Sequence, residues 1–118
     1  MVEGSCHCGA VRYRVATAPV EAKSCNCSLC RRYGALWAYY ETAEVQVEGE
    51  GTATVPYVQG DATLANHHCA TCGCVTHWRG LGQYADRTAV NIRLMEPDVV
   101  ETVRIRRFDG ADTWQLLD

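Results

Sequence analysis

Apolar and polar residues alternate with a period of two along much of this chain. Such alternation predicts half-buried strands. It runs through residues 11–15, 44–48, 88–94 and 103–106. Residues 35–40 are more uniformly apolar and aromatic, so we expect a strand covered on both faces there. Turn-forming residues separate these segments at residues 49–51, 60–61, 80–82 and 109–110.

Only residues 28–33 look helical, and they cover little more than one turn. Short strands separated by turns predict an all-β domain of layered antiparallel sheets with at most one short helix. A chain of 118 residues has room for one core, so we expect a single domain over residues 1–118. The strands are short and polar, and bound metal would help to stabilise a domain of this size.

The chain has eight cysteines. No segment is long and apolar enough to span a membrane, and the first residues lack the basic and apolar regions of a signal peptide. We therefore expect a cytoplasmic protein with reduced thiols, in which metal binding explains the cysteines better than disulfides do. A disulfide framework, as in small secreted domains, is the alternative.

The charge balance bears on the partners of the protein. The formal net charge is −3, and thiolates bound to two zinc ions would bring it to about −6. A surface that acidic repels phosphate backbones, which argues against a zinc ribbon that binds nucleic acid. Basic residues gather at Arg31 and Arg32 and at residues 104–107, where a solvated strand end is the simplest interpretation. We expect small-molecule partners, with no nucleic acid and no membrane.

The densest group of candidate metal ligands in the chain consists of Cys25, Cys27 and Cys30. The C-x-x-C spacing of Cys27 and Cys30 lets a turn aim two sulfurs at one point, and Cys25 adds a third from the preceding extended segment. Three ligands are one fewer than a structural zinc prefers, and a catalytic zinc keeps such a position open for substrate. This spacing therefore predicts a zinc site with catalytic potential.

Two further pairs of cysteines lie far apart in the chain. Cys69 and Cys72 form a C-x-x-C-G turn, in which Gly73 permits the positive φ that directs backbone N–H groups at sulfur. Cys6 and Cys8 form a C-x-C pair. Together the two pairs suggest one closed four-cysteine zinc site, which would tie two remote hairpins together and contribute to folding.

Cys74 is left over from these two groups. It lies two residues beyond Cys72, which in a strand puts both side chains on the same face. We expect a buried free thiol near the closed site. In the alternative, Cys74 completes the group of Cys25, Cys27 and Cys30, which would make that site structural.

The histidines are a second possible source of ligands. We expect hydrogen-bonded roles for His7, His67 and His68, because the cysteines already supply enough ligands. His77 is the exception. It follows the C-x-x-C-G turn on the same segment, and we expect it to face the substrate cleft, where a histidine can also relay protons.

Three blocks of the chain resemble the glutathione-dependent formaldehyde-activating enzyme family, in the order of that family. They are GSCHCGAVRY (residues 4–13), CNCSLCRRYG (residues 25–34) and CATCG (residues 69–73), and residues 107–110 also look like the end of the family. The resemblance implies an all-β fold of the Mss4-like type, with sheets joined at a structural zinc on Cys6, Cys8, Cys69 and Cys72. It also implies a second, weaker catalytic zinc on Cys25, Cys27 and Cys30.

The activity that the resemblance implies is the condensation of formaldehyde with glutathione, classed in reverse as a carbon–sulfur lyase reaction. Glutathione would be the co-substrate, and we expect cationic side chains around its two carboxylates. We expect Arg31, Arg32 and His77 to bind it, although the arginines can also form a solvated helix face. Four aromatic residues could line the cleft or belong to the core: Trp37, Tyr39, Tyr40 and Trp78.

Three residues depart from the family pattern: Asn26, His68 and Cys74. They remove no ligand, but they leave the identity of the thiol and the aldehyde open. The alternative function is a non-catalytic binding module of the same Mss4-like fold, similar to a guanine-nucleotide-exchange-factor-like module, in which both zinc ions only stabilise the domain.

Overall fold

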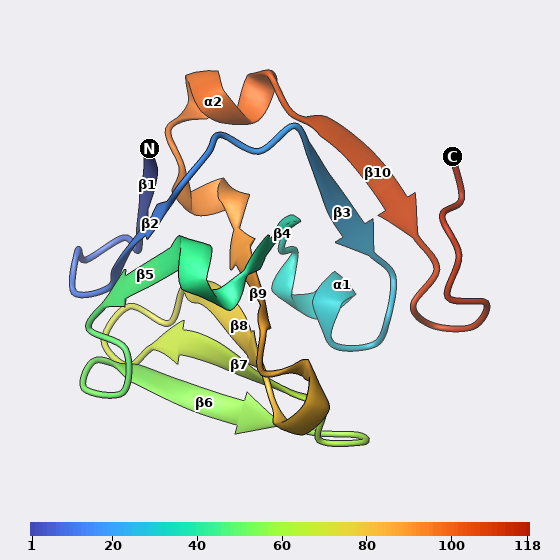
Figure 1. The fold of residues 1–118 in the computed structure, drawn as a ribbon, viewed down its shortest axis with the longest axis horizontal. Helices are drawn as coiled ribbons and strands as arrows, with labels where there is room; N and C mark the ends of the chain where they lie inside the picture. Colours follow the sequence, from blue (N-terminus) through green and yellow to red (C-terminus); the bar gives the residue numbers. More distant parts are fainter.

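A computed structural model describes residues 1–118 and contains ten strands in two sheets (Figure 1). The strands are β1 (Val2–Ser5), β2 (Arg12–Val15), β3 (Glu21–Cys25), β4 (Trp37–Glu41), β5 (Val45–Glu48), β6 (Thr54–Val58), β7 (Leu64–Cys69), β8 (Val75–Gly80), β9 (Arg87–Asn91) and β10 (Arg104–Phe108). The α-helices are α1 (Cys30–Tyr33) and α2 (Pro97–Glu101). The 3-10 turns are η1 (Thr42–Glu44), η2 (Gly82–Tyr84) and η3 (Ile92–Leu94).

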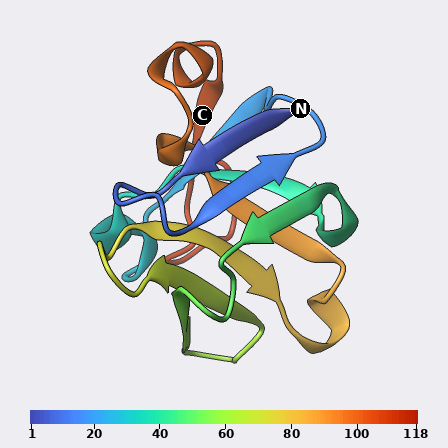
Figure 2. The same cartoon turned by 90° about the vertical axis from the view of Figure 1, so that its left-hand side faces the viewer.

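The two sheets are layered. The smaller has the order β1-β2-β5, and the larger has the order β10-β3-β4-β9-β8-β7-β6. Figure 2 shows the three strands of the smaller sheet lying in front of the larger sheet. All neighbouring strands are antiparallel except β10 and β3, which are parallel. The predicted all-β class and layered sheets are confirmed, with this one parallel pair added.

The main core lies between the two sheets. Tyr13, Val15 and Val45 of the smaller sheet are buried in one cluster with residues of the larger sheet, such as Ala38 and Val90. The phenol O–H of Tyr13 donates to a backbone carbonyl of β9 at 2.8 Å. The alternation of residues 11–15 and 44–48 therefore marks, as predicted, the inward faces of β2 and β5.

The central strands differ from their predicted burial. Residues 88–91 of β9 are all buried, because β4 and β8 flank this strand and both faces of the sheet are covered there. The strand then ends at Asn91, and η3 follows as a 3-10 turn. In β4, Trp37 and Ala38 are buried on opposite faces, but Tyr39 is 45% exposed, so the predicted double coverage holds only for the start of the strand.

The structure has two short helices where at most one was expected. Helix α1 lies within the predicted residues 28–33 and ends at Gly34, whose φ of 67° suits a helix C-terminus. Helix α2 begins with Pro97, whose fixed φ favours the first helical turn. At five residues it is too short to produce a helical periodicity in the sequence.

This architecture brings the cysteines together at two places. The β1–β2 loop meets the β7–β8 turn, and the end of β3 with the start of α1 meets the turn that follows β10. None of the helices has the length and hydrophobicity that crossing a membrane requires.

Candidate metal centres

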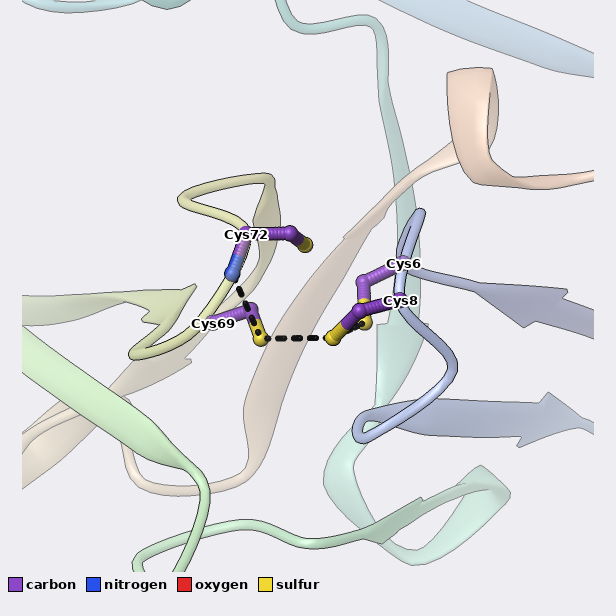
Figure 3. A group of neighbouring side chains, drawn as sticks. All are labelled: Cys6, Cys8, Cys69 and Cys72. Carbon is purple, nitrogen blue, oxygen red and sulfur yellow. Dashed lines mark hydrogen bonds between the residues drawn. The ribbon is translucent and has the colours of Figure 1, made fainter.

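The first centre consists of Cys6, Cys8, Cys69 and Cys72 (Figure 3). Two of these thiols come from the β1–β2 loop and two from the end of β7 and the turn after it. The four sulfurs lie within 4.8 Å of one another, with 3.7 Å between Cys6 and Cys8 and 3.6 Å between Cys8 and Cys69. Sulfurs bound to one tetrahedral zinc, each at about 2.3 Å, would be about 3.8 Å apart. The thiols therefore fit a single four-coordinate zinc.

Backbone N–H groups point at the sulfurs of this centre. The N–H of Val11 donates to Sγ of Cys6 at 3.3 Å. The N–H groups of Cys72 and Thr71 donate to Sγ of Cys69 at 3.5 and 3.4 Å, and they lower the pKa of that thiol. Gly73 has a φ of 80°, the conformation predicted for this turn. Since zinc binds thiolates, these donors favour the ligating form.

Cys74 lies beside the first centre. It packs, together with Cys72, against the buried cluster of Cys6, Val11 and Cys69. The second group of neighbouring cysteines does not include it. The expectation of a thiol near the closed site is confirmed in position, although Cys74 is only partly buried. The alternative in which Cys74 completes the other site is wrong.

The second centre consists of Cys25, Cys27 and Cys30, whose sulfurs also lie within 4.8 Å of one another. Cys25 ends β3, Cys30 begins α1, and Cys27 lies in the connection between them. The N–H of Cys30 donates to Sγ of Cys27 at 3.2 Å. All three residues are half-buried.

The thiols of the second centre are electrostatically unequal. The pKa of Cys25 is lowered to about 5, first by its interaction with the Cys30 thiol and also by the N–H groups of Cys27 and Gly110. The pKa of Cys30 is raised, first by Cys25 and then by burial. The indole N–H of Trp37 is buried without a hydrogen-bond partner, and its proximity to Cys30 lowers the pKa of that thiol, against the effects of Cys25 and burial. This N–H is placed to stabilise a thiolate at Cys30.

Asn26 ties the second centre to the chain after β10. Its Nδ2 donates to Oδ1 of Asp109 at 3.0 Å, and its Oδ1 accepts from the N–H of Ala111 at 3.0 Å. Its backbone N–H donates to the carbonyl of Phe108 at 3.1 Å. The asparagine noted as a departure from the family pattern therefore holds the cysteine loop in place.

A pocket of about 320 Å³ opens beside the second centre. Its lining includes Cys25 and Cys30 on one side and three arginines, Arg31, Arg93 and Arg107. The arginines come from α1, η3 and β10, which are far apart in the sequence. The arrangement places fixed positive charge next to the thiols, which suits a ligand that carries both sulfur and carboxylate groups.

The two arginines singled out from the sequence separate in the structure. Arg31 lines the pocket. Arg32 does not, because its Nη1 donates to the carbonyl of Ser28 at 2.7 Å on the exposed side of the turn. Arg93 takes its place: its Nε donates to the carbonyl of Gly34 at 2.7 Å, which fixes it at the end of α1. No sequence pattern marked Arg93, which lies in a region read as a strand.

His77 does not face the second centre. It is fully buried in β8, and its ring stacks on that of His67 with 4.5 Å between centroids. The next residue, Trp78, packs on the buried cluster that contains Trp37, and Cys30 packs against the same cluster. Successive residues of a strand point to opposite faces, so His77 and Trp78 cannot both face that centre. The expectation that His77 lines the substrate cleft is therefore corrected.

His77 belongs instead to a polar cluster with Glu50 and His67, in which one ligand atom of each residue lies within 4.8 Å of the others. Nε2 of His77 is 2.5 Å from Oε2 of Glu50. The hydrogen bond from His77, followed by that from Arg79, lowers the pKa of Glu50 to about 2. Burial lowers the pKa of His67 to about 4. These residues gave no spacing signal because they lie on three separate segments.

The four candidate aromatic residues play different parts. Trp37 belongs to the core, and the Tyr40 hydroxyl donates to the carbonyl of Thr17 at 2.8 Å. Tyr39 and Trp78 contact each other with 5.8 Å between ring centroids. None of the four is among the residues that line the pocket beside the second centre.

The fold and the two cysteine centres define a class: a small all-β protein built around clusters of thiols suited to metal. The chain belongs to the glutathione-dependent formaldehyde-activating enzyme family, because the model of that family matches residues 1–105. The resemblance identified from the sequence blocks is thereby confirmed.

Two individual proteins are also similar to this chain. A segment of 33 residues is 54% identical to a Halomonas elongata protein named "Putative glutathione-dependent formaldehyde-activating enzyme". The match covers 27% of this chain and spans only 21% of that relative. A crystal structure of a Rhodobacter sphaeroides protein is 29% identical, with a TM-score of 0.71 over 87% of this chain and 98% of that one.

Proposed function

We propose that this protein is a zinc enzyme of the carbon–sulfur lyase type that acts on adducts of glutathione, or a related thiol, with formaldehyde or another small aldehyde. The family supports the chemistry of glutathione and formaldehyde. We assign separate roles to two zinc ions: Cys25, Cys27 and Cys30 hold the catalytic zinc, and the first centre holds a structural one.

The observation that carries the proposal is the position of the three thiols of the second centre beside a pocket with an arginine wall. Three cysteine ligands leave a fourth zinc position for a substrate atom. Arg31, Arg93 and Arg107 would bind the carboxylates of glutathione, which positions the tripeptide with its sulfur toward the cysteines.

The reaction forms one bond between the thiol sulfur and the carbonyl carbon of the aldehyde. The electron pair of the C=O π bond moves to oxygen, which takes up the proton that the thiol gives off, so the balance is complete without a further reactant. A zinc bound at the second centre would lower the pKa of a coordinated thiol or polarise the aldehyde oxygen. The protein residues supply orientation: Asn26 holds the cysteine loop, and the hydrogen bond from Arg93 to Gly34 holds that arginine in the lining of the pocket.

The first centre has a different role in this proposal. Its four cysteines join the β1–β2 loop to the β7–β8 turn, and its closed ligand set leaves no position for substrate. Zinc bound there would contribute its binding free energy to folding.

The test is the zinc-dependent turnover of S-hydroxymethylglutathione by the purified full chain, measured against the uncatalysed rate because thiols add to formaldehyde unaided. Turnover above that rate, lost when the weaker zinc is removed, supports the enzyme. A protein that holds both zinc ions and leaves the rate unchanged would instead be a zinc-stabilised binding module.

A further inference from the structure

Glu50, His67 and His77, which we call the His–Glu cluster, come from the β5–β6 turn, β7 and β8 and place one ligand atom each within 4.8 Å of the others. We propose that this cluster is a third cation site, which binds a divalent transition metal of the zinc class through two imidazoles and one carboxylate. The site contains no cysteine, and it does not depend on the proposed lyase function.

Both imidazole rings are held by threonine hydroxyls on one side. Nδ1 of His67 is 2.9 Å from Oγ1 of Thr54, and Nδ1 of His77 is 2.8 Å from Oγ1 of Thr76. This leaves Nε2 of each ring as the nitrogen that can ligate, and Nε2 of His67 has no protein hydrogen-bond partner. Metal-binding histidines are typically oriented through their second ring nitrogen in this way.

The hydroxyl of Thr76 allows His77 to change its tautomer at no cost in hydrogen bonds. Oγ1 of Thr76 lies within reach of both Nδ1 of His77, at 2.8 Å, and the carbonyl of His67, at 3.3 Å. When Nε2 of His77 carries the proton, it donates to Glu50 and Thr76 donates to Nδ1. When a metal occupies Nε2, the proton moves to Nδ1, Nδ1 donates to Thr76, and Thr76 donates to the carbonyl. No proton leaves the site.

Glu50 is held as an ionised ligand by Arg79. The guanidinium donates from Nε to Oε2 at 2.8 Å and from Nη2 to Oε1 at 3.1 Å. An ionised carboxylate offers about four lone-pair positions, so these bonds leave capacity for a cation. Ligand atoms about 2.0–2.2 Å from a zinc-class ion are roughly 3 Å or more apart. The carboxylate must therefore move slightly from His77, and the two stacked rings must turn so that their Nε2 lone pairs converge on one ion.

The ligand set indicates the class of metal. Two imidazoles and one carboxylate hold catalytic zinc in several enzyme families and non-haem iron in others, with further positions open to water. The two cysteine centres present only thiolates, which favour softer metal ions. The protein thus offers two chemically distinct kinds of site, and spectroscopy can tell them apart.

The experiment adds Co²⁺ to the full chain after both cysteine centres are loaded with zinc. We expect one additional equivalent of Co²⁺ with the weak visible absorption of nitrogen and oxygen ligands and without thiolate charge-transfer absorption. Glu50→Gln and His67→Gln should each weaken this uptake more than about tenfold, because losing even a group that only orients a ligand costs 10- to 100-fold. His68→Gln is the matched control, since the neighbouring histidine of β7 lies outside the cluster.

Zinc content and circular dichroism establish that each variant is folded before the titration is interpreted. Wild-type protein that takes up no Co²⁺ of this kind would overturn the proposal. Uptake that is the same in Glu50→Gln, His67→Gln and wild type would also overturn it. The cluster would then only join the β5–β6 turn to β7 and β8 through hydrogen bonds. Co²⁺ that appears only with thiolate charge-transfer absorption has exchanged into a cysteine centre and counts equally against the site.

Discussion

Gly110 lies directly against Cys25. A Cβ atom added to Gly110 would come within 2.5 Å of Sγ of Cys25 and 3.5 Å of Cβ of Cys27. A larger residue does not fit at position 110, because the chain passes so close to the Cys25 sulfur. The turn after β10 forms one wall of the second centre.

Gly110→Ala should displace the Cys25 sulfur and lower zinc occupancy of the second centre while the first centre stays loaded. We expect zinc content to fall from about two ions to about one per chain, given that zinc needs its ligands near ideal distances. Metal analysis of the purified variant measures this. Asp112→Ala, an exposed change in the same turn, is the control, and zinc loss in both variants alike would contradict the role assigned to Gly110.

Removal of one cysteine from each centre should have opposite consequences for stability and activity. Cys72→Ser breaks the closed site between the two loops and should destabilise the fold by about 3 kcal/mol or more, or roughly 10 °C or more in Tm. Cys27→Ser should leave Tm within a few degrees and abolish zinc-dependent turnover of the thiol adduct. Thermal melts combined with zinc stoichiometry make the comparison. Equal loss of stability in the two variants would refute the division into structural and catalytic centres.

Arg31 and Arg32 offer a matched pair for the thiol-binding pocket. Arg31→Gln should raise KM for a glutathione adduct roughly tenfold, the effect expected from losing one charge-assisted hydrogen bond to a carboxylate. Arg32→Gln should change KM little, because Arg32 donates to Ser28 outside the pocket. Steady-state kinetics on both variants provide the measurement. A larger effect at Arg32 than at Arg31 would show that substrate binds elsewhere.

The ion pair of Glu50 with Arg79 and its hydrogen bond with His77 predict a specific pH dependence of stability. The pKa of Glu50 is about 2 in the folded protein and 4.5 for an unperturbed carboxyl, because His77 and then Arg79 stabilise the charge. A lowered folded-state pKa contributes stability that is fully present above pH 4.5 and is lost as pH falls toward 2. Glu50→Gln should cost about 1–2 kcal/mol at pH 7 after allowance for solvent screening.

Urea denaturation of Glu50→Gln and wild type at several pH values tests this directly. Acid release of zinc affects both proteins, so the difference between their free energies of unfolding isolates Glu50. That difference should be constant between pH 7 and about pH 5 and shrink below pH 4.5. A difference that grows on acidification would have the wrong sign.

The sequence by itself determined the local cysteine groups, whereas joining Cys6 and Cys8 to Cys69 and Cys72 also needed the family resemblance. The spacings within these groups are local, since C-x-C and C-x-x-C fix two sulfurs within one turn whatever the rest of the fold does. It also determined β2 and β5, whose outer faces meet water and therefore alternate. It did not reveal β1, β3, β6, β7 or β8, because their mixtures of polar and small residues follow no simple period.

Only the tertiary structure decided what surrounds the centres. Strand pairing sets His67 opposite His77, which buries His77 in the His–Glu cluster. Packing brings Arg93 and Arg107 to the pocket beside Cys25 from remote elements. It also places Cys74 with the first centre, which leaves Cys25, Cys27 and Cys30 as a set of three. Side chains that meet through pairing and packing share no spacing along the chain, so no sequence pattern records their contact.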